Sequence, residues 1–330
     1  MKSFAGALFA LFSVAACQFP AAAQETITVG MATGVNQVPS LVAEAQGFFK
    51  DEGLSVALKP VERGNLAVEA IVSGSMQFAE VSDATFLAAV DKGIPLVALG
   101  AASRGFTGKM VAAPGLGEVK SLADLKGKRI GIQVGTGVHN VFMRLVKKEG
   151  LTEKDFNISN VRVTDMPTAM ASTGTFDAVL GWDPMMQRIV QAGYGKEVIS
   201  AASFQEMAGI TYPLLLVANK DFIEKNKEKV QHFVNAYSHA HQWIRQNPEG
   251  ALDAYVDTIT KAGAPLDKET VRTMMFEVDK FGGVRFIDSD VAELQGSADF
   301  LHETGVLSTA PDVKTIIDPS FSAAADEKFK

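Results

Sequence analysis

Cysteine is nearly absent from this sequence, and basic residues are outnumbered by acidic ones. Cys17 is the only cysteine among 330 residues. If a leader is cleaved after Ala23, the mature chain has none, which excludes disulfides, thiol nucleophiles and cysteine-ligated metals. The 38 acidic and 31 basic residues give a net charge of −7. This balance argues against nucleic acid or an anionic membrane surface as a partner.

Sequence motifs of several enzyme classes are also missing. There is no Gly-x-Ser-x-Gly elbow and no phosphate loop, and residues 302–306 break the His-Glu-x-x-His pattern. Residues 135–137 lack the third glycine of a dinucleotide fingerprint. His239 and His241 are two apart on a predicted helix, so they do not share a face and are poor joint metal ligands. We therefore expect a protein that is not an enzyme, with no metal and no cofactor.

The long apolar run that does occur lies at the N-terminus. Residues 4–16 are apolar and follow Lys2, and residues 20–23 supply small residues for cleavage, as in a secretory signal peptide. The run is too short for a stable membrane-spanning helix. We predict a cleaved signal peptide over residues 1–23 and a periplasmic mature protein. Residues 14–17 also resemble the lipobox of bacterial lipoproteins, so a form anchored at Cys17 is the alternative.

Strand-like and helix-like segments alternate along the rest of the chain. Repeated β–α units predict mostly parallel sheets covered by helices. The break at residues 114–117 is a candidate crossing between two such blocks, and the helical pattern after residue 220 adds a C-terminal group of helices. The expected strands include residues 26–31, 54–58, 78–81, 95–102, 109–113, 161–163, 176–181, 197–199 and 211–218.

Residues 126–140 read as a buried strand, a glycine turn and the start of a helix. Apolar residues recur at helical spacing after Gly137, and Gly150 ends the helix. The first N–H groups of a helix have no partner within it, and the helix dipole is positive there. A glycine turn lets a ligand approach this backbone, so the segment suits an anion. An ordinary β–turn–α connection would show the same pattern.

Three motifs resemble periplasmic solute-binding proteins of ABC importers, in the nitrate, sulfonate, taurine and thiamine-precursor group. Residues 44–54 resemble the group's A-x-G-(F/Y)-F-x-x-E-G-L helix. Residues 121–128 resemble its s-x-x-D-L-K-G-K segment, and residues 176–184 its G-x-x-D-A…W-(D/E)-P segment. Within the group, residues 133–140 and 182–184 are most similar to the aliphatic-sulfonate binders, which carry Ser-His-Asn where this chain has Val-His-Asn.

The resemblance implies the bilobed periplasmic-binding-protein fold of type II. This is an α/β fold with two mostly parallel sheets, helices on both faces of each sheet, and a ligand cleft between the lobes. We expect residues 24–113 and 209–330 to form lobe one with the C-terminal helices, and residues 114–208 to form lobe two. Ligands in such sheets lie beyond the carboxyl ends of strands, where helices start.

Residues that directly follow predicted strands are therefore the candidate ligand contacts. Several have ordinary structural roles as alternatives. Ser82, Asp83 and Asp183 are good helix caps, and Trp182 could pack in a core. Arg104 could chelate a sulfonate or carboxylate, or be a solvated surface charge. The full candidate set is Thr33, Asn36, Gln37, Ser82, Asp83, Arg104, Gly135, Thr136, His139, Asn140, Trp182, Asp183 and Tyr212.

The resemblance implies a monomeric binding protein that delivers a small solute to an inner-membrane ABC permease with its cytoplasmic ATPase. We expect a small organic anion, either an aliphatic sulfonate or a taurine-like zwitterion whose ammonium group Asp83 and Asp183 could hold. Two acids in the cleft leave open a nitrogen heterocycle, such as a thiamine-precursor pyrimidine. A sensor or an enzyme on the same fold is the other alternative.

Overall fold

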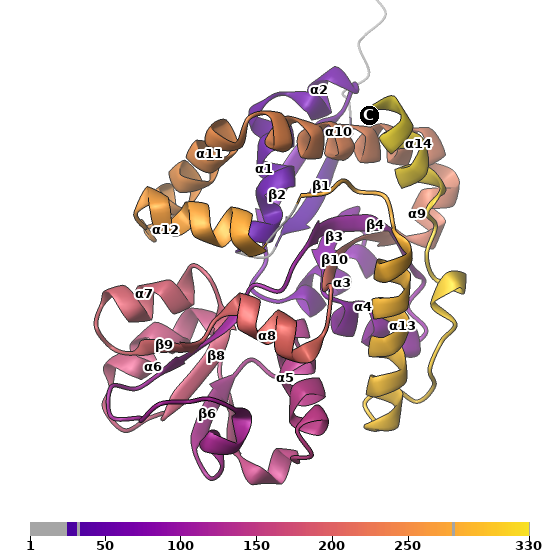
Figure 1. Ribbon diagram of the computed structural model, residues 1–330. Coiled ribbons are helices and arrows are strands. Elements are labelled where there is room, and N and C mark those ends of the chain that lie inside the picture. Colours follow the sequence, from indigo (N-terminus) through magenta and orange to yellow (C-terminus); the bar gives the residue numbers. More distant parts are fainter. Residues whose placement is uncertain (1–24, 32–33, 279–280, 330) are drawn as a thin grey trace, which may run out of the picture.

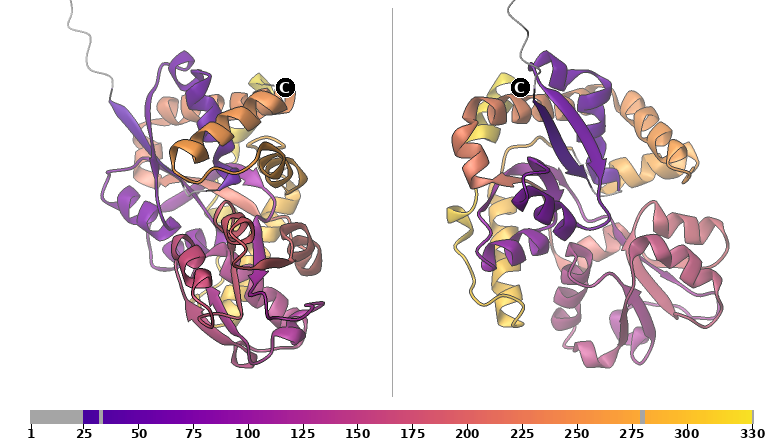
Figure 2. Two further views of the ribbon diagram at one scale, coloured as in Figure 1. Left: turned by 90° about the vertical axis from the view of Figure 1, so that its left-hand side faces the viewer. Right: turned by 180° about the vertical axis from the view of Figure 1, so that it is seen from behind.

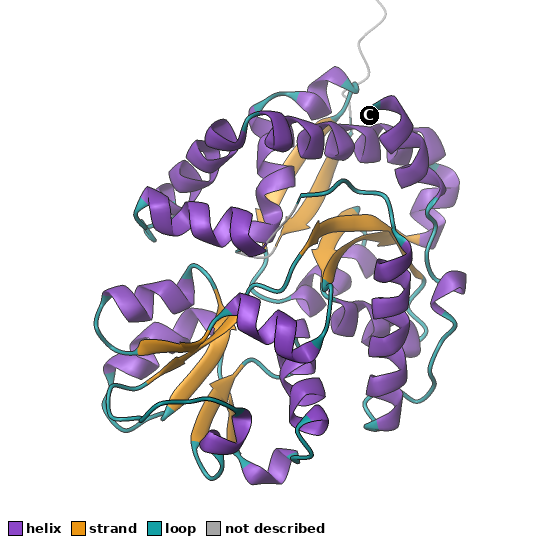
Figure 3. Ribbon diagram, viewed as in Figure 1, coloured by secondary structure: helices purple, strands orange, loops and turns teal. Residues whose placement is uncertain are grey.

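The computed structural model describes residues 25–31, 34–278 and 281–329 of the chain. The predicted signal peptide, Cys17 and Thr33 lie outside these residues. The described part forms two α/β lobes, each built on a five-stranded sheet with helices on both faces (Figures 1 and 3). None of its helices combines the length and the apolar character needed to cross a membrane.

The first sheet has the strand order β2-β1-β3-β10-β4. All its strands run parallel except β10, which is antiparallel to both of its neighbours. The strands are β1 (Thr26–Met31), β2 (Ser55–Pro60), β3 (Phe78–Val81), β4 (Leu96–Arg104) and β10 (Pro213–Asn219).

The second sheet repeats this plan with the order β7-β6-β8-β5-β9, in which β5 is the antiparallel strand. In both sheets the antiparallel strand is the one that enters directly after the chain has crossed from the other lobe. The strands are β5 (Gly108–Ala112), β6 (Arg129–Ile132), β7 (Asn157–Asn160), β8 (Ala178–Trp182) and β9 (Lys196–Ile199).

The position of β5 corrects the lobe boundary expected from the sequence. This strand was expected in lobe one, but it pairs with β8 and β9. The first crossing therefore lies between Arg104 and Gly108, not at residues 114–117. The strand expected at residues 161–163 was also wrong, because β7 ends at Asn160 and a 3-10 turn begins at Val163.

Helices cover both faces of each sheet with separate apolar cores. In lobe one, a core with Phe49, Phe78 and Phe233 fills one face, and a second core with Phe86 and Leu294 fills the other. The lobe-one helices are α1 (Val38–Ala45), α2 (Phe48–Asp51), α3 (Gly64–Val72), α4 (Asp83–Asp91), α9 (Lys220–Lys225), α10 (Lys227–Gln246), α11 (Pro248–Lys261), α12 (Lys268–Thr273), α13 (Asp288–Glu303) and α14 (Ser320–Lys328).

Lobe two has the same layering on a smaller scale. Phe142 of α5 belongs to one of its cores and Ile189 of α7 to the other. Its helices are α5 (Gly137–Lys148), α6 (Met166–Ala171), α7 (Met185–Gln191) and α8 (Ala201–Ala208). The helix α5 contacts both α4 and α13 of lobe one, so the two lobes meet at this helix. Figure 2 shows the two lobes from two further directions.

Candidate functional site

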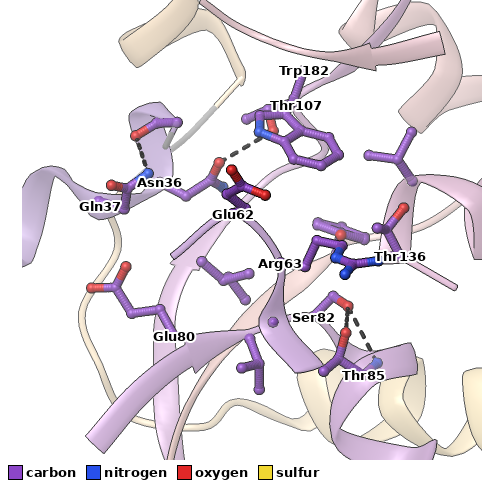
Figure 4. A pocket seen from close by; sticks show the side chains of 17 residues that line it. Asn36, Gln37, Glu62, Arg63, Glu80, Ser82, Thr85, Thr107, Thr136 and Trp182 are labelled. Atoms are coloured by element: carbon purple, nitrogen blue, oxygen red, sulfur yellow. Dashed lines mark hydrogen bonds between the residues drawn. The ribbon is translucent and has the colours of Figure 1, made fainter. Parts of the chain in front are cut away.

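A cavity of about 80 Å³, lined by both polar and apolar side chains, lies between the lobes. This volume has room for a small solute and not only for a single water. The residues that line it come from the ends of strands, the starts of helices and the crossing segments, as labelled in part in Figure 4. They are Gly34, Asn36, Gln37, Glu62, Arg63, Gly64, Glu80, Val81, Ser82, Thr85, Thr107, Thr136, Gly137, Val138, Trp182, Tyr212 and Leu214.

Three helices begin at this cavity. Ser82 caps α4 by accepting a hydrogen bond from the Thr85 N–H at 3.3 Å. Thr136 caps α5 in the same way, accepting from the His139 N–H at 3.3 Å. Arg63 precedes α3, where no side chain caps the helix. The positive ends of three helix dipoles therefore converge on one small space, which favours an anion.

The Thr136 hydroxyl is already engaged, which limits its role. Its hydrogen is donated to the Gln133 carbonyl oxygen at 2.8 Å. The donors left for a ligand at this helix are the N–H groups of Gly137 and Val138, the first two positions of α5.

Arg63 is a cavity residue that the sequence analysis missed. Its Nε is buried and has no hydrogen-bond partner among the described residues. No ion pair involving Arg63 occurs within that part of the chain either. Arg63 lies three residues after the end of β2, in the connection to α3, and the sequence analysis took no candidates from this connection.

Glu80 is the second missed residue, and it lies within β3. Its side chain is buried, and Oε1 accepts hydrogen bonds from the hydroxyls of Ser40 and Tyr237, both at 2.5 Å. Burial raises the pKa of Glu80 to about 7, against the lowering effect of these two hydrogen bonds. Nothing in the local pattern of β3 marks this residue, because Tyr237 is 157 positions away in the chain.

Six of the sequence-predicted residues line the cavity: Asn36, Gln37, Ser82, Thr136, Trp182 and Tyr212. Tyr212 has a φ of 47°, a left-handed backbone that is uncommon for a residue with a side chain. Such conformations persist where the surrounding structure holds them, and they concentrate at ligand sites and switches.

Asp83 and Asn140 lie beside the cavity and bind each other. Asn140 Nδ2 of α5 donates to Asp83 Oδ2 of α4 at 3.1 Å, and Ser297 of α13 donates to the same oxygen. Asp83 Oδ1 accepts from the Ala84 N–H at 2.7 Å. Both carboxylate oxygens are thus occupied, and the Asp83–Asn140 pair joins the two lobes.

Arg104 points away from the cavity, contrary to the expected role in binding an anion. Its guanidinium forms a bidentate pair with Asp290 and donates to the carbonyl oxygens of Gly283 and Arg285. The side chain of Asp290 is fully buried. Arg104 therefore anchors the end of β4 to the start of α13.

Asp183 faces a different part of the interlobe region. Its carboxylate pairs with Lys109 Nζ at 2.7 Å and accepts from the Gln187 N–H at 3.0 Å, inside the first turn of α7. Lys109 also pairs with Glu197 at 3.1 Å. These residues line a second, more open cleft of about 450 Å³.

His139 and Gly135 do not line the cavity. His139 is largely buried, which lowers its pKa, while the charge of Glu153 opposes this effect. Gly135 has a φ of 80°, and an added Cβ would meet nothing within 4 Å. The close approach lies at Gly137, where an added Cβ would stand 2.0 Å from Tyr212 Oη and 2.7 Å from Ser82 Cβ. The helix start of lobe two thus touches lobe one at a glycine.

Two similar lobes with a cavity between them define the bilobed solute-binding fold. The periplasmic aliphatic sulphonate-binding protein SsuA from Escherichia coli shares this fold, with a TM-score of 0.71 and 19% identity over 89% of this chain and 98% of that one. The profile described as NMT1/THI5 like matches residues 35–251. The chain belongs to this NMT1/THI5-like family.

Relatives of the chain include both a protein named for binding and a protein named as an enzyme. A Bacillus subtilis protein named for binding aliphatic sulfonates is 22% identical over 88% of this chain and 85% of its own length. The 4-amino-5-hydroxymethyl-2-methylpyrimidine phosphate synthase of Aspergillus parasiticus is 27% identical over 70% of this chain and 69% of its own length. Family membership therefore leaves both binding and enzymatic relatives, and the function of this chain is argued from the cavity.

Proposed function

We propose that this protein is the substrate-binding component of an ABC importer. It captures a small organic anion, an aliphatic sulfonate or a taurine-like solute, in the interlobe cavity and delivers it to the membrane permease. The observation that carries the proposal is the buried, unpaired Nε of Arg63 beside the start of α5. A guanidinium and free helix N–H groups are the donors that suit a sulfonate or carboxylate.

Capture is coupled to closure of the lobes. The anion contacts Arg63 of lobe one and the Gly137 and Val138 N–H groups of lobe two only when the lobes are together. The ligand therefore stabilises the closed form, which the permease then recognises. Outside the cavity, the Asp83–Asn140 hydrogen bond and the Arg144–Glu293 ion pair join α5 to lobe one in the same closed arrangement.

The cellular location and the assembly follow from the same proposal. The protein is exported through a cleaved leader over residues 1–23, works in the periplasm as a monomer, and meets the permease at the inner membrane. Mass spectrometry of the mature N-terminus tests this, since it should begin near Gln24. A diacylated Cys17 would show that the protein is a lipoprotein anchored in the membrane. An intact Met1 would contradict export.

A second candidate is a binding protein for a nitrogen heterocycle such as a thiamine-precursor pyrimidine. The enzyme among the relatives and the buried carboxyl of Glu80 in the cavity favour it. An enzyme on this fold is the weaker candidate, because the sequence lacks the hydrolase elbow, the phosphate loop and the His-Glu-x-x-His pattern.

A thermal-shift panel separates these solutes, because a ligand that binds only the folded state raises the melting temperature. The panel contains ethanesulfonate, taurine, nitrate, small carboxylates and aminopyrimidines. We expect a sulfonate or carboxylate to raise the melting temperature of the wild type and to have no effect on Arg63→Gln. Arg188→Gln, on the exposed surface of α7, is the matched control and should respond like the wild type. A response to pyrimidines alone would favour the second candidate.

A further inference from the structure

The end of the cavity opposite Arg63 is built from Asn36, Gln37 and Glu80. In Figure 4, Glu80 and Gln37 lie on one side of the view, and Arg63 and Thr136 lie on the other. All three residues at this end belong to lobe one and are nearly fully buried. The cavity therefore has one end at Arg63 and another end that carries a carboxyl group and two amides. Glu62 also lines the cavity, and its carboxylate pairs with Arg162.

Glu80 has one oxygen that the fold does not use. Both Ser40 and Tyr237 donate their hydroxyls to Oε1, whereas the buried Oε2 has no hydrogen-bond partner within the described residues. An unmatched buried oxygen costs free energy, so a carboxyl here is unfavourable for stability alone. The two hydroxyls fix the carboxyl and leave Oε2 as the free acceptor in the wall of the cavity.

Asn36 is also held by one hydrogen bond, but the group it leaves free is a donor. Its Oδ1 accepts a hydrogen bond from the Thr107 hydroxyl at 3.2 Å, which orients the amide. Its buried Nδ2 has no partner among the residues that the structure describes. One end of the cavity thus holds an oriented free acceptor and an oriented free donor, both from side chains that other groups have fixed.

The two ends of the cavity are close enough for one small molecule. Glu80 and Ser82 are two positions apart on extended backbone, which corresponds to about 7 Å, and Ser82 caps α4 at the anion-binding end. This backbone spacing is short enough for one small solute to contact both ends of the cavity.

We propose that the solute is bifunctional, with an anionic group at Arg63 and the start of α5 and an amino or ammonium group that donates to Oε2 of Glu80. This inference rests on the proposed function and narrows it to amino-bearing anions. Glu80, and not Asp83 or Asp183, then binds the amino group, because the carboxylates of Asp83 and Asp183 already pair with other residues.

Isothermal titration calorimetry with matched pairs of ligands tests the inference. One pair is taurine and ethanesulfonate, and the other is β-alanine and propionate; within each pair the ligands differ by the amino group. We expect the wild type to bind the amino-bearing member of one pair at least about tenfold more tightly, a difference of about 1.4 kcal/mol. Glu80→Gln should bring the two members within about threefold of each other.

Glu206→Gln, on the exposed surface of α8, is the matched control and should keep the wild-type preference. If the wild type binds a ligand but shows equal affinity for the two members in both pairs, the inference is overturned and the proposed function stands. A preference retained in folded Glu80→Gln would overturn it as well. Absence of binding by all four ligands would contradict the proposed function and, with it, the inference.

Discussion

Replacing Glu80 by glutamine should change how the stability of the ligand-free protein depends on pH. Burial raises the pKa of this carboxyl from an ordinary value of 4.5 to about 7. Between these values the folded protein binds a proton that the unfolded chain has already released. The stabilisation due to Glu80 is therefore fully present below pH 4.5 and is lost as the pH rises through about 7.

The size of the effect follows from the difference between the two pKa values. A single pKa unit is worth about 1.4 kcal/mol, so the full change is about 3 kcal/mol. Glutamine at position 80 can still accept the Ser40 and Tyr237 hydroxyls through its carbonyl oxygen, and it does not titrate. Relative to Glu80→Gln, the wild type should lose about 3 kcal/mol between pH 4.5 and pH 8.

Urea unfolding of both proteins at a series of pH values measures this difference. Asp83, whose pKa burial also raises, titrates in both proteins and cancels in the comparison. The charged groups on the cavity side of Glu80, Glu62 and Arg63, are likewise common to both. A flat difference for Glu80→Gln would refute the reasoning, because Glu80 would then be as solvated as an ordinary surface carboxylate.

Three further substitutions separate binding from scaffolding. Gly137→Ala should hold the lobes apart, because the added Cβ would stand 2.0 Å from the Tyr212 hydroxyl. Overpacking costs about 1–3 kcal/mol, so the affinity measured by calorimetry should fall roughly 5- to 150-fold. An unchanged affinity would show that ligand binding does not need this contact between the lobes. Arg104→Ala should lower the free energy of unfolding by about 3–5 kcal/mol, because it leaves the buried Asp290 unpaired. The ligand affinity should stay the same. A loss of affinity without a loss of stability would show that Arg104 contacts the ligand. Asp183→Asn should lower the melting temperature because it breaks the pair with Lys109; an affinity change of tenfold or more, about 1.4 kcal/mol, would place Asp183 in contact with the ligand.

The local signals in the sequence predict much of the architecture. Alternating strands and helices give two α/β blocks, and Ser82 and Thr136 were correctly placed at helix starts. The lobe to which β5 belongs was not predictable in this way. All five of its residues are buried, and a fully buried strand shows the same apolar run whichever sheet it joins.

The cavity was predicted only in part, because long-range pairing decides which polar residues are free. Arg104 ends β4 and Arg63 lies three residues after β2, so both arginines are near the carboxyl end of a strand. Arg104 meets Asp290, which lies 186 positions later, whereas Arg63 has no ion-pair partner among the described residues. Glu80 shows the same limit, since the hydroxyls that orient it come from Ser40 and Tyr237. Such pairings depend on the tertiary fold and leave no periodic signal in the chain.

A crystal structure of the mature protein with taurine or ethanesulfonate tests the central claim most directly. The account predicts that the sulfonate lies within hydrogen-bonding distance of Arg63 and of the Gly137 and Val138 N–H groups, with the lobes closed around it. A sulfonate bound at Lys109 in the second cleft, with the Arg63 cavity filled only by water, would contradict the account.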